Sequence, residues 1–192
     1  ESADMAQTLF APVEKDIRAI AGIDCFGADD DTLASVTGAL LLDKGQTVSV
    51  AESCTGGGLG HLFTSVAGSS SYFHGGIISY DNSVKINLLG VSSTDLDQQG
   101  AVSDGVAQQM ALGVRSRLNT DWGISITGVA GPGGGTDEKP VGLVYFGLAF
   151  PDGTVQSKGL RLNDSHGRDW IRWLSVCTAI DWLRRALQTS KI

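Results

Sequence analysis

The sequence lacks the features that mark several large classes of protein. It has three cysteines in 192 residues (Cys25, Cys54 and Cys177), which are widely spaced and form no Cys-x-x-Cys pair. This pattern argues against a zinc site or a disulfide scaffold and favours a reducing compartment, so we expect a cytoplasmic protein with no metal. No uninterrupted apolar run reaches membrane length and no signal-peptide pattern is found, so we expect no membrane partner.

Basic residues are also few. The chain has 14 Lys and Arg against 21 Asp and Glu, a formal net charge of −7. An acidic balance argues against a broad nucleic-acid surface, although it leaves room for a local basic pocket. The hydrophobic content of 42% and the length suit one well-buried domain with a short appendage.

Neither of the two glycine-rich stretches carries a nucleotide fingerprint. The first is Thr55-Gly-Gly-Gly-Leu-Gly60 and the second spans 128–135. Neither has the Lys-Ser/Thr pair of a Walker A loop, and neither fits G-x-G-x-x-G in its required context. An ordinary ATPase or a dinucleotide-dependent dehydrogenase is therefore disfavoured. Backbone amides in either loop remain suited to a single phosphate, and the alternative for 131–135 is a plain flexible turn.

Strand-like and helix-like segments alternate from residue 30 onward. Residues 1–29 are weakly patterned, with one short helix over 13–23, and we expect them to be an N-terminal arm or linker to a domain over 30–192. Within that domain we expect helices near 29–44, 59–67, 84–89, 103–118 and 168–187, and strands at 47–51, 75–80, 122–127, 141–150 and 155–162. The turn at 151–153 predicts that the last two strands form a hairpin, so the fold class is α/β with a mixed sheet. The loops 53–58, 81–85 and 127–139 should then meet at one sheet edge.

The first of these loops holds a candidate nucleophile. Ser53 follows a buried strand and precedes the glycine run, where a hydroxyl faces whatever the loop amides hold. The alternative is that Ser53 only caps the next helix. Cys54 is a rival nucleophile, because a helix N-terminus would lower its pKa. Glu52 is either a carboxylate near the site or an anchor that accepts hydrogen bonds from the turn.

A nucleophilic serine needs a base. The three histidines, His61, His74 and His166, show no Ser-His-Asp order and are expected at the surface. Lys85 is the better candidate, because a helix start and partial burial both favour the neutral amine. Tyr80 is placed to assist it. The alternative for Lys85 is a solvated surface lysine.

Six motifs occur in an order that resembles one known family. They are Ala51-Glu-Ser-Cys-Thr-Gly-Gly57, Ala67-Gly-Ser-Ser70, Ile78-Ser-Tyr-Asp-Asn82 with Lys85, Gly100-Ala-Val-Ser103, Ile126-Thr-Gly-Val-Ala-Gly-Pro132 and Glu138-Lys-Pro-Val-Gly142. Over about 30–187 the sequence resembles the CinA C-terminal domain family, the nicotinamide-nucleotide amidohydrolases or NMN deamidases. Residues 12–45 also resemble the segment that joins the two domains of full-length CinA.

The resemblance implies a fold and an activity. The fold is a three-layer α/β/α sandwich with a mixed sheet of about five strands. The reaction is hydrolysis of nicotinamide mononucleotide (NMN) to nicotinate mononucleotide and ammonia in bacterial pyridine nucleotide salvage, without metal or cofactor. Ser53 is then the nucleophile and Lys85 its base, with Tyr80 assisting. We also expect a homo-oligomer, with a dimer favoured.

The same resemblance suggests which residues hold the substrate. Backbone amides from 54 to 57 would stabilise the oxyanion, and Arg168 would bind the phosphate, since Asn163-Asp-Ser-His-Gly-Arg-Asp169 is similar to the family's Gly-Asp-Arg-Asp. The expected substrate contacts are Cys54, Thr55, Gly56, Gly57, Thr127, Gly128, Gly131, Gly133 and Arg168. The alternative function is a non-catalytic interaction domain of a competence- or damage-associated CinA protein, and a third possibility is an inactive member of the family.

Overall fold

The computed structural model describes residues 2–189 and divides the chain into two compact units, Glu1–Thr32 and Leu33–Ile192. The first unit contains α1 (Ser2–Ala21) and a short 3-10 helix, η1 (Gly22–Asp24). The expected helix over 13–23 was therefore wrong in extent. Its apolar residues recur at four-residue spacing from Met5 through Leu9 to Val13, which places them on one face, and Pro12 lies inside the helix without ending it.

The second unit alternates strands and helices along the chain. Its strands are β1 (Val48–Glu52), β2 (Phe73–Ile78), β3 (Trp122–Gly128), β4 (Leu143–Ala149) and β5 (Val155–Arg161). Its helices are α2 (Leu33–Asp43), α3 (Gly58–Thr64), η2 (Ser69–Ser71), α4 (Asn82–Leu89), α5 (Ser93–Gln99), α6 (Asp104–Leu118) and α7 (Gly167–Thr189). Each of the five expected strands is present, and the sequence pattern did not predict α5 or the short 3-10 helix η2.

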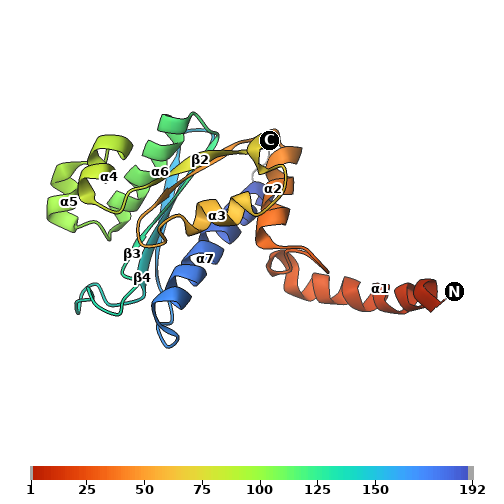
Figure 1. Ribbon diagram of the computed structural model, residues 1–192. Helices are drawn as coiled ribbons and strands as arrows, with labels where there is room; N and C mark the ends of the chain where they lie inside the picture. The colour runs from red at the N-terminus through yellow and green to blue at the C-terminus, as the bar shows by residue number, and fades with distance from the viewer. Residues whose placement is uncertain (1, 190–192) are drawn as a thin grey trace. The chain divides into compact units, whose positions relative to one another are not determined.

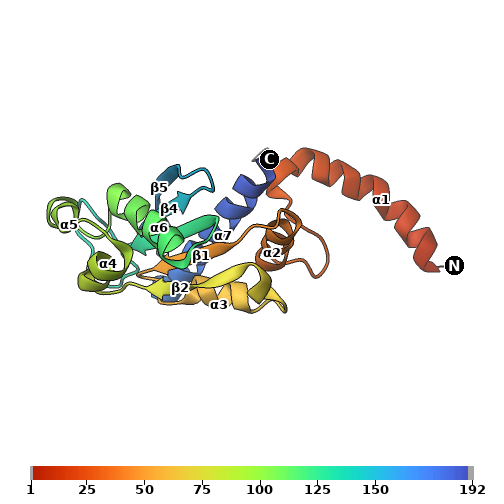
Figure 2. The ribbon, with the colours of Figure 1, turned by 90° about the horizontal axis from the view of Figure 1, so that it is seen from above.

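The strands form one mixed sheet in the order β2-β1-β3-β4-β5. The first strand is parallel to both of its neighbours, while β3 and β4, and β4 and β5, pair antiparallel, which confirms the expected hairpin. Helices α4, α5 and α6 lie on one face, and α2, α3 and α7 on the other (Figure 1). Figure 2 shows α6 in front of the strands with part of α7 behind them. The α/β/α sandwich is thus confirmed.

Alternating side chains on β3 explain the two different interfaces. Ile124 and Ile126 pack in the core beneath α7. The residues that alternate with them, Gly123 and Ser125, are small. A Cβ on Gly123 would lie 2.2 Å from the Ala111 carbonyl oxygen, and the Ser125 hydroxyl donates to the Ala107 carbonyl at 2.5 Å. Small side chains on this face let α6 pack directly against the sheet backbone, on the face opposite to α7.

The position of β1 in the sheet determines where a site can form. Because β1 runs parallel between β2 and β3, the carboxyl ends of all three strands lie at one edge of the sheet. The segments that leave these ends are 53–57, 79–81 and the loop after Gly128. This is the edge at which α/β sheets bind ligands. None of the helices within residues 2–189 is both long and apolar enough to cross a bilayer.

Candidate active site

The turn that carries Ser53 is built on the carboxylate of Glu52. This side chain is 1% exposed and accepts three backbone N–H bonds, from Gly57 at 3.1 Å, Leu59 at 3.0 Å and Gly60 at 2.9 Å. Glu52 is therefore the anchor of the turn, one of the two roles that the sequence left open. Because it occupies the amides at the start of α3, those amides are not available to a ligand.

Ser53 does not cap that helix. Gly57 is the N-cap residue of α3, in the left-handed region at φ 100°, and the Glu52 carboxylate, not the Ser53 hydroxyl, accepts the first N–H groups of the helix. The capping interpretation of Ser53 is wrong for this reason. Its backbone N–H instead donates to the Ile126 carbonyl on β3 at 3.0 Å, which fixes the residue to the sheet edge and leaves its hydroxyl for other partners.

Lys85 is the partner of that hydroxyl. Its Nζ lies 3.4 Å from Ser53 Oγ and also donates to the carbonyls of Ser79 at 2.6 Å and Tyr80 at 3.1 Å. The side chain is 1% exposed, so the solvated-surface alternative is wrong. Burial lowers the pKa of the Lys85 ammonium below its ordinary value of 10.5, and the nearby Asp81 carboxylate opposes this shift without reversing it.

The three contacts of Lys85 define what its neutral form would do. The carbonyls of Ser79 and Tyr80 can only accept hydrogen bonds, so they take the two N–H groups of a neutral amine. The lone pair is then left to face the remaining neighbour, Ser53 Oγ. This arrangement suits an amine that removes a proton from the serine.

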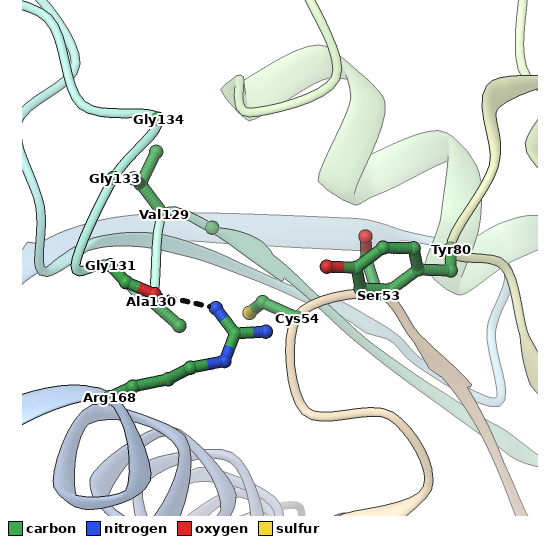
Figure 3. Close-up of a pocket in the computed structure, with 10 residues that line it drawn as sticks. Ser53, Cys54, Tyr80, Val129, Ala130, Gly131, Gly133, Gly134 and Arg168 are labelled. Carbon is green, nitrogen blue, oxygen red and sulfur yellow. Dashed lines mark hydrogen bonds between the residues drawn. The ribbon is translucent and has the colours of Figure 1, made fainter.

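Tyr80 contributes mainly through its main chain. Its carbonyl is one of the two acceptors of Lys85, whereas the side chain is 65% exposed. Within the described part of the chain, the phenol has no hydrogen-bond partner. The ring lies beside Ser53 at the mouth of a cavity (Figure 3). The contact that supports an assisting role of Tyr80 is therefore the one between its backbone carbonyl and Lys85.

Cys54 is a poor rival to Ser53. Its side chain is 6% exposed, and burial raises the pKa of the thiol to about 11. The neighbouring Glu52 carboxylate raises it further, while Arg168 and Arg172 act in the opposite direction and do not compensate. The expectation of a lowered pKa was wrong, because the thiol is desolvated. A neutral thiol is a weak nucleophile at pH 7, so the serine is favoured.

An open cavity of about 220 Å³ adjoins these residues. Ser53 and Tyr80 lie at one end, Arg168 lies at the other, and Cys54 lies between them (Figure 3). The Arg168 Nη1 donates to the Gly131 carbonyl at 2.7 Å, which places a cation beside the glycine loop. The full lining is Ser53, Cys54, Tyr80, Gly128, Val129, Ala130, Gly131, Gly133, Gly134 and Arg168.

The structure does not bring every expected contact residue into this cavity. Thr127 is 1% exposed, and its hydroxyl donates to the Ala101 carbonyl at 2.8 Å on the side of the sheet that carries α6. The expected contacts that do not line the cavity are Thr55, Gly56, Gly57 and Thr127. Val129, Ala130 and Gly134 line it although the sequence analysis did not name them; their place in the 127–139 loop was the available signal.

Hydrogen bonds within the turn reduce the number of backbone N–H groups that could stabilise an oxyanion. The N–H of Gly56 donates to the Ser53 carbonyl at 3.1 Å, and that of Gly57 to Glu52. Within residues 2–189, the N–H groups of Cys54 and Thr55 donate to no other residue, so these two are the remaining candidates to donate to a ligand. In the same residues, no group of three or more His, Cys, Asp or Glu side chains is arranged to hold a metal ion.

Comparison with known proteins agrees with this fold. Residues 30–187 match the sequence model of the CinA C-terminal domain. The chain belongs to the CinA C-terminal domain family. Among curated relatives, the CinA-like protein of Rippkaea orientalis is 65% identical over 182 residues, 95% of this chain and 44% of the relative. The CinA-like protein of Synechocystis is 59% identical over 186 residues, which are 97% of this chain and 45% of that relative. The chain thus spans less than half the length of these relatives.

Solved members of the family share the fold. The competence/damage inducible protein CihA from Agrobacterium tumefaciens is 40% identical with a TM-score of 0.79, over 85% of this chain and 98% of that protein. A CinA superfamily protein from Klebsiella pneumoniae is 28% identical with a TM-score of 0.77, over 83% of this chain and 100% of that protein. The sheet, and with it the edge that bears Ser53, is therefore that of the family.

Proposed function

We propose that the protein hydrolyses the carboxamide of nicotinamide mononucleotide to nicotinate mononucleotide and ammonia. The observation that carries the proposal is the buried Lys85 amine, which lies 3.4 Å from Ser53 Oγ and donates to two carbonyls. In its neutral form this amine would turn its lone pair toward the serine. A Ser-Lys pair is a known variant of the serine-triad arrangement. The resemblance to NMN deamidases supplies the substrate class.

The cavity suits a substrate with a reactive amide at one end and an anion at the other. Ser53 and Tyr80 at one end leave an open face for a pyridine carboxamide, and Arg168 and the glycine loop lie at the other end. Arginine binds phosphate through paired, charge-assisted hydrogen bonds, and backbone amides of glycines allow close approach. In this orientation the phosphate would replace or join the Gly131 carbonyl as a partner of Arg168.

The reaction then follows in two steps. Neutral Lys85 takes the Ser53 proton while Oγ attacks the carboxamide carbon, and the amides of Cys54 and Thr55 stabilise the oxyanion. Lys85 returns the proton to the amide nitrogen and the C–N bond breaks. Ammonia departs, and the acyl group remains bound to Ser53 as an ester. Water attacks this ester, gives a proton to Lys85 and releases the acid, and the proton returns to Ser53.

Ammonia release from nicotinamide mononucleotide tests the proposal. We expect steady release of ammonia together with one equivalent of nicotinate mononucleotide. In acid-quenched samples we also expect a nicotinoyl-nucleotide adduct on the peptide that contains Ser53. A well-folded protein that binds the nucleotide but releases no ammonia would contradict the proposed activity.

We expect Arg168→Gln to raise KM for the nucleotide by about tenfold or more while kcat changes little. The reason is that a hydrogen bond to a charged group contributes roughly 1.5–3 kcal/mol, and Arg168 lies at the far end of the cavity from Ser53. The measurement is steady-state kinetics with the nucleotide and with nicotinamide riboside, which lacks the phosphate. With the riboside, the KM values of the wild type and of Arg168→Gln should differ little.

Arg161→Gln is the matched control, since Arg161 is an exposed arginine on β5 outside the cavity lining. It removes the same charge and should leave KM unchanged. An equal rise in KM in both variants would mean that general charge, and not a phosphate contact, is responsible.

A further inference from the structure

The turn that carries Ser53 is held on its outer side by a second arginine. Arg172 lies on α7, and its Nη2 donates to the Thr55 carbonyl at 2.9 Å. The same carbonyl accepts the Gly58 N–H at 3.2 Å, at the start of α3. Arg172 therefore joins α7 to a turn that begins two residues before Thr55, although it does not line the cavity that contains Ser53.

The contact is transmitted to Ser53 through one peptide group. The Thr55 carbonyl and the Gly56 N–H belong to the same peptide, and that N–H donates to the Ser53 carbonyl at 3.1 Å. A cation on the carbonyl polarises the peptide and strengthens its N–H as a donor. Arg172 thus acts on the main chain of the nucleophile.

The other contacts of Arg172 do not explain its placement. Its Nη1 lies 3.4 Å from the carboxylate of Asp169, whose side chain is 94% exposed, and such an ion pair contributes little. Its Nε is buried and has no hydrogen-bond partner among the described residues, which is a cost. A Cβ on Gly56 would lie 3.7 Å from Nη2, so the guanidinium packs close to the turn.

We propose that Arg172 is a positioning residue for the nucleophile: it holds the peptide that fixes the Ser53 backbone at the end of β1. The proposal rests on the function proposed above. It differs from the role given to Arg168, since Arg168 lines the cavity and would bind substrate, whereas Arg172 contacts the turn from the other side. Loss of Arg172 should therefore affect the chemical step and not substrate binding.

Arg172→Ala is expected to lower kcat by about 10- to 100-fold, because a small misplacement of a reacting group has effects of this size. KM should stay within about twofold. Arg172→Lys should recover part of kcat, since an ammonium can also donate to the Thr55 carbonyl. Asp169→Asn is the matched control: it removes the weak ion pair without touching Thr55, and should leave kcat unchanged.

A second readout separates this inference from the proposed function. A fluorophosphonate reacts with an activated serine without any nucleotide: Oγ displaces fluoride from phosphorus, and Lys85 takes the proton. We expect Arg172→Ala to slow this labelling of Ser53 to a similar extent as kcat. If the wild type is labelled but releases no ammonia, and the variant is labelled more slowly, the positioning role stands while the proposed substrate fails.

The structural alternative predicts something different. If Arg172 only stabilises the fold, Arg172→Ala will lower the melting temperature, but the folded fraction at 25 °C will retain wild-type kcat and labelling rate. That result, or a rise in KM with unchanged kcat, would overturn the proposal. Active-site titration with the fluorophosphonate gives the folded, reactive fraction against which both rates are expressed.

Discussion

Ser53→Ala should lower kcat for ammonia release by roughly 10⁴-fold or more, the scale seen when the nucleophile of a serine hydrolase is removed. The loss follows from the mechanism, since among residues 2–189 the hydrogen-bond contacts of Lys85 Nζ are Ser53 Oγ and two carbonyls, and only the serine can give it a proton. Binding should survive, because Arg168 lies at the other end of the cavity. Ammonia release and isothermal titration with the nucleotide measure the two effects separately.

Cys54→Ala is the matched control for this experiment. Cys54 is the adjacent residue, lines the same cavity and carries the thiol that was considered as a rival nucleophile. Because burial raises the pKa of its thiol to about 11, we expect its removal to change kcat by less than tenfold. A Ser53→Ala protein that keeps its turnover, beside a Cys54→Ala protein that loses it, would reverse the assignment of the nucleophile.

The alternation of strands and helices predicted the sheet, and its exceptions have physical causes. Helix α5 (Ser93–Gln99) was missed because Leu96 is its only buried residue, so it shows no apolar periodicity. Its one local signal was Ser92, whose hydroxyl accepts from the Asp95 N–H as an N-cap. On α7, Trp173 is 51% exposed, although Ile180 and Leu183 on the same helix are fully buried.

The site was predictable where it depends on topology and unpredictable where it depends on packing. Three loops at the ends of parallel strands placed Ser53 and Lys85 near one another, and the structure confirms that proximity at 3.4 Å. The direction of the Cys54 pKa shift depends on how deeply the thiol is buried, which no local pattern gives. Thr127 was expected to face the ligand, yet strand alternation turns its side chain toward Ala101.

The contacts of Arg172 illustrate a further limit. Arg172 and Thr55 are separated by 117 residues, and nothing in either segment indicates the other. The sequence named Arg168 because a motif surrounds it, whereas an arginine one helical turn later has no motif. Only the packing of α7 against α3 shows that the two arginines meet different partners, the glycine loop and the nucleophile turn.

Lys85→Met should abolish most of the activity, with an expected fall in kcat of roughly 10³-fold or more, as for loss of the base in related catalytic arrangements. Methionine fills a similar volume without an amine, and the melting temperature checks that the two carbonyls left without Nζ are tolerated. Lys158→Met is the matched control. Lys158 is another lysine whose pKa is lowered by burial, but it lies over the rings of Phe146 and Trp182.

The dependence of kcat/KM on pH tests the same residue by its charge. The protonated amine is inactive and the neutral amine is the base, so the rate should rise with pH through the pKa of Lys85 and level off above it. Because burial lowers that pKa, the midpoint of the rise should lie below the ordinary value of 10.5. It should persist in Lys158→Met and vanish from the residual activity of Lys85→Met. A rise that remains in Lys85→Met would assign the titration, and the role of base, to a different group.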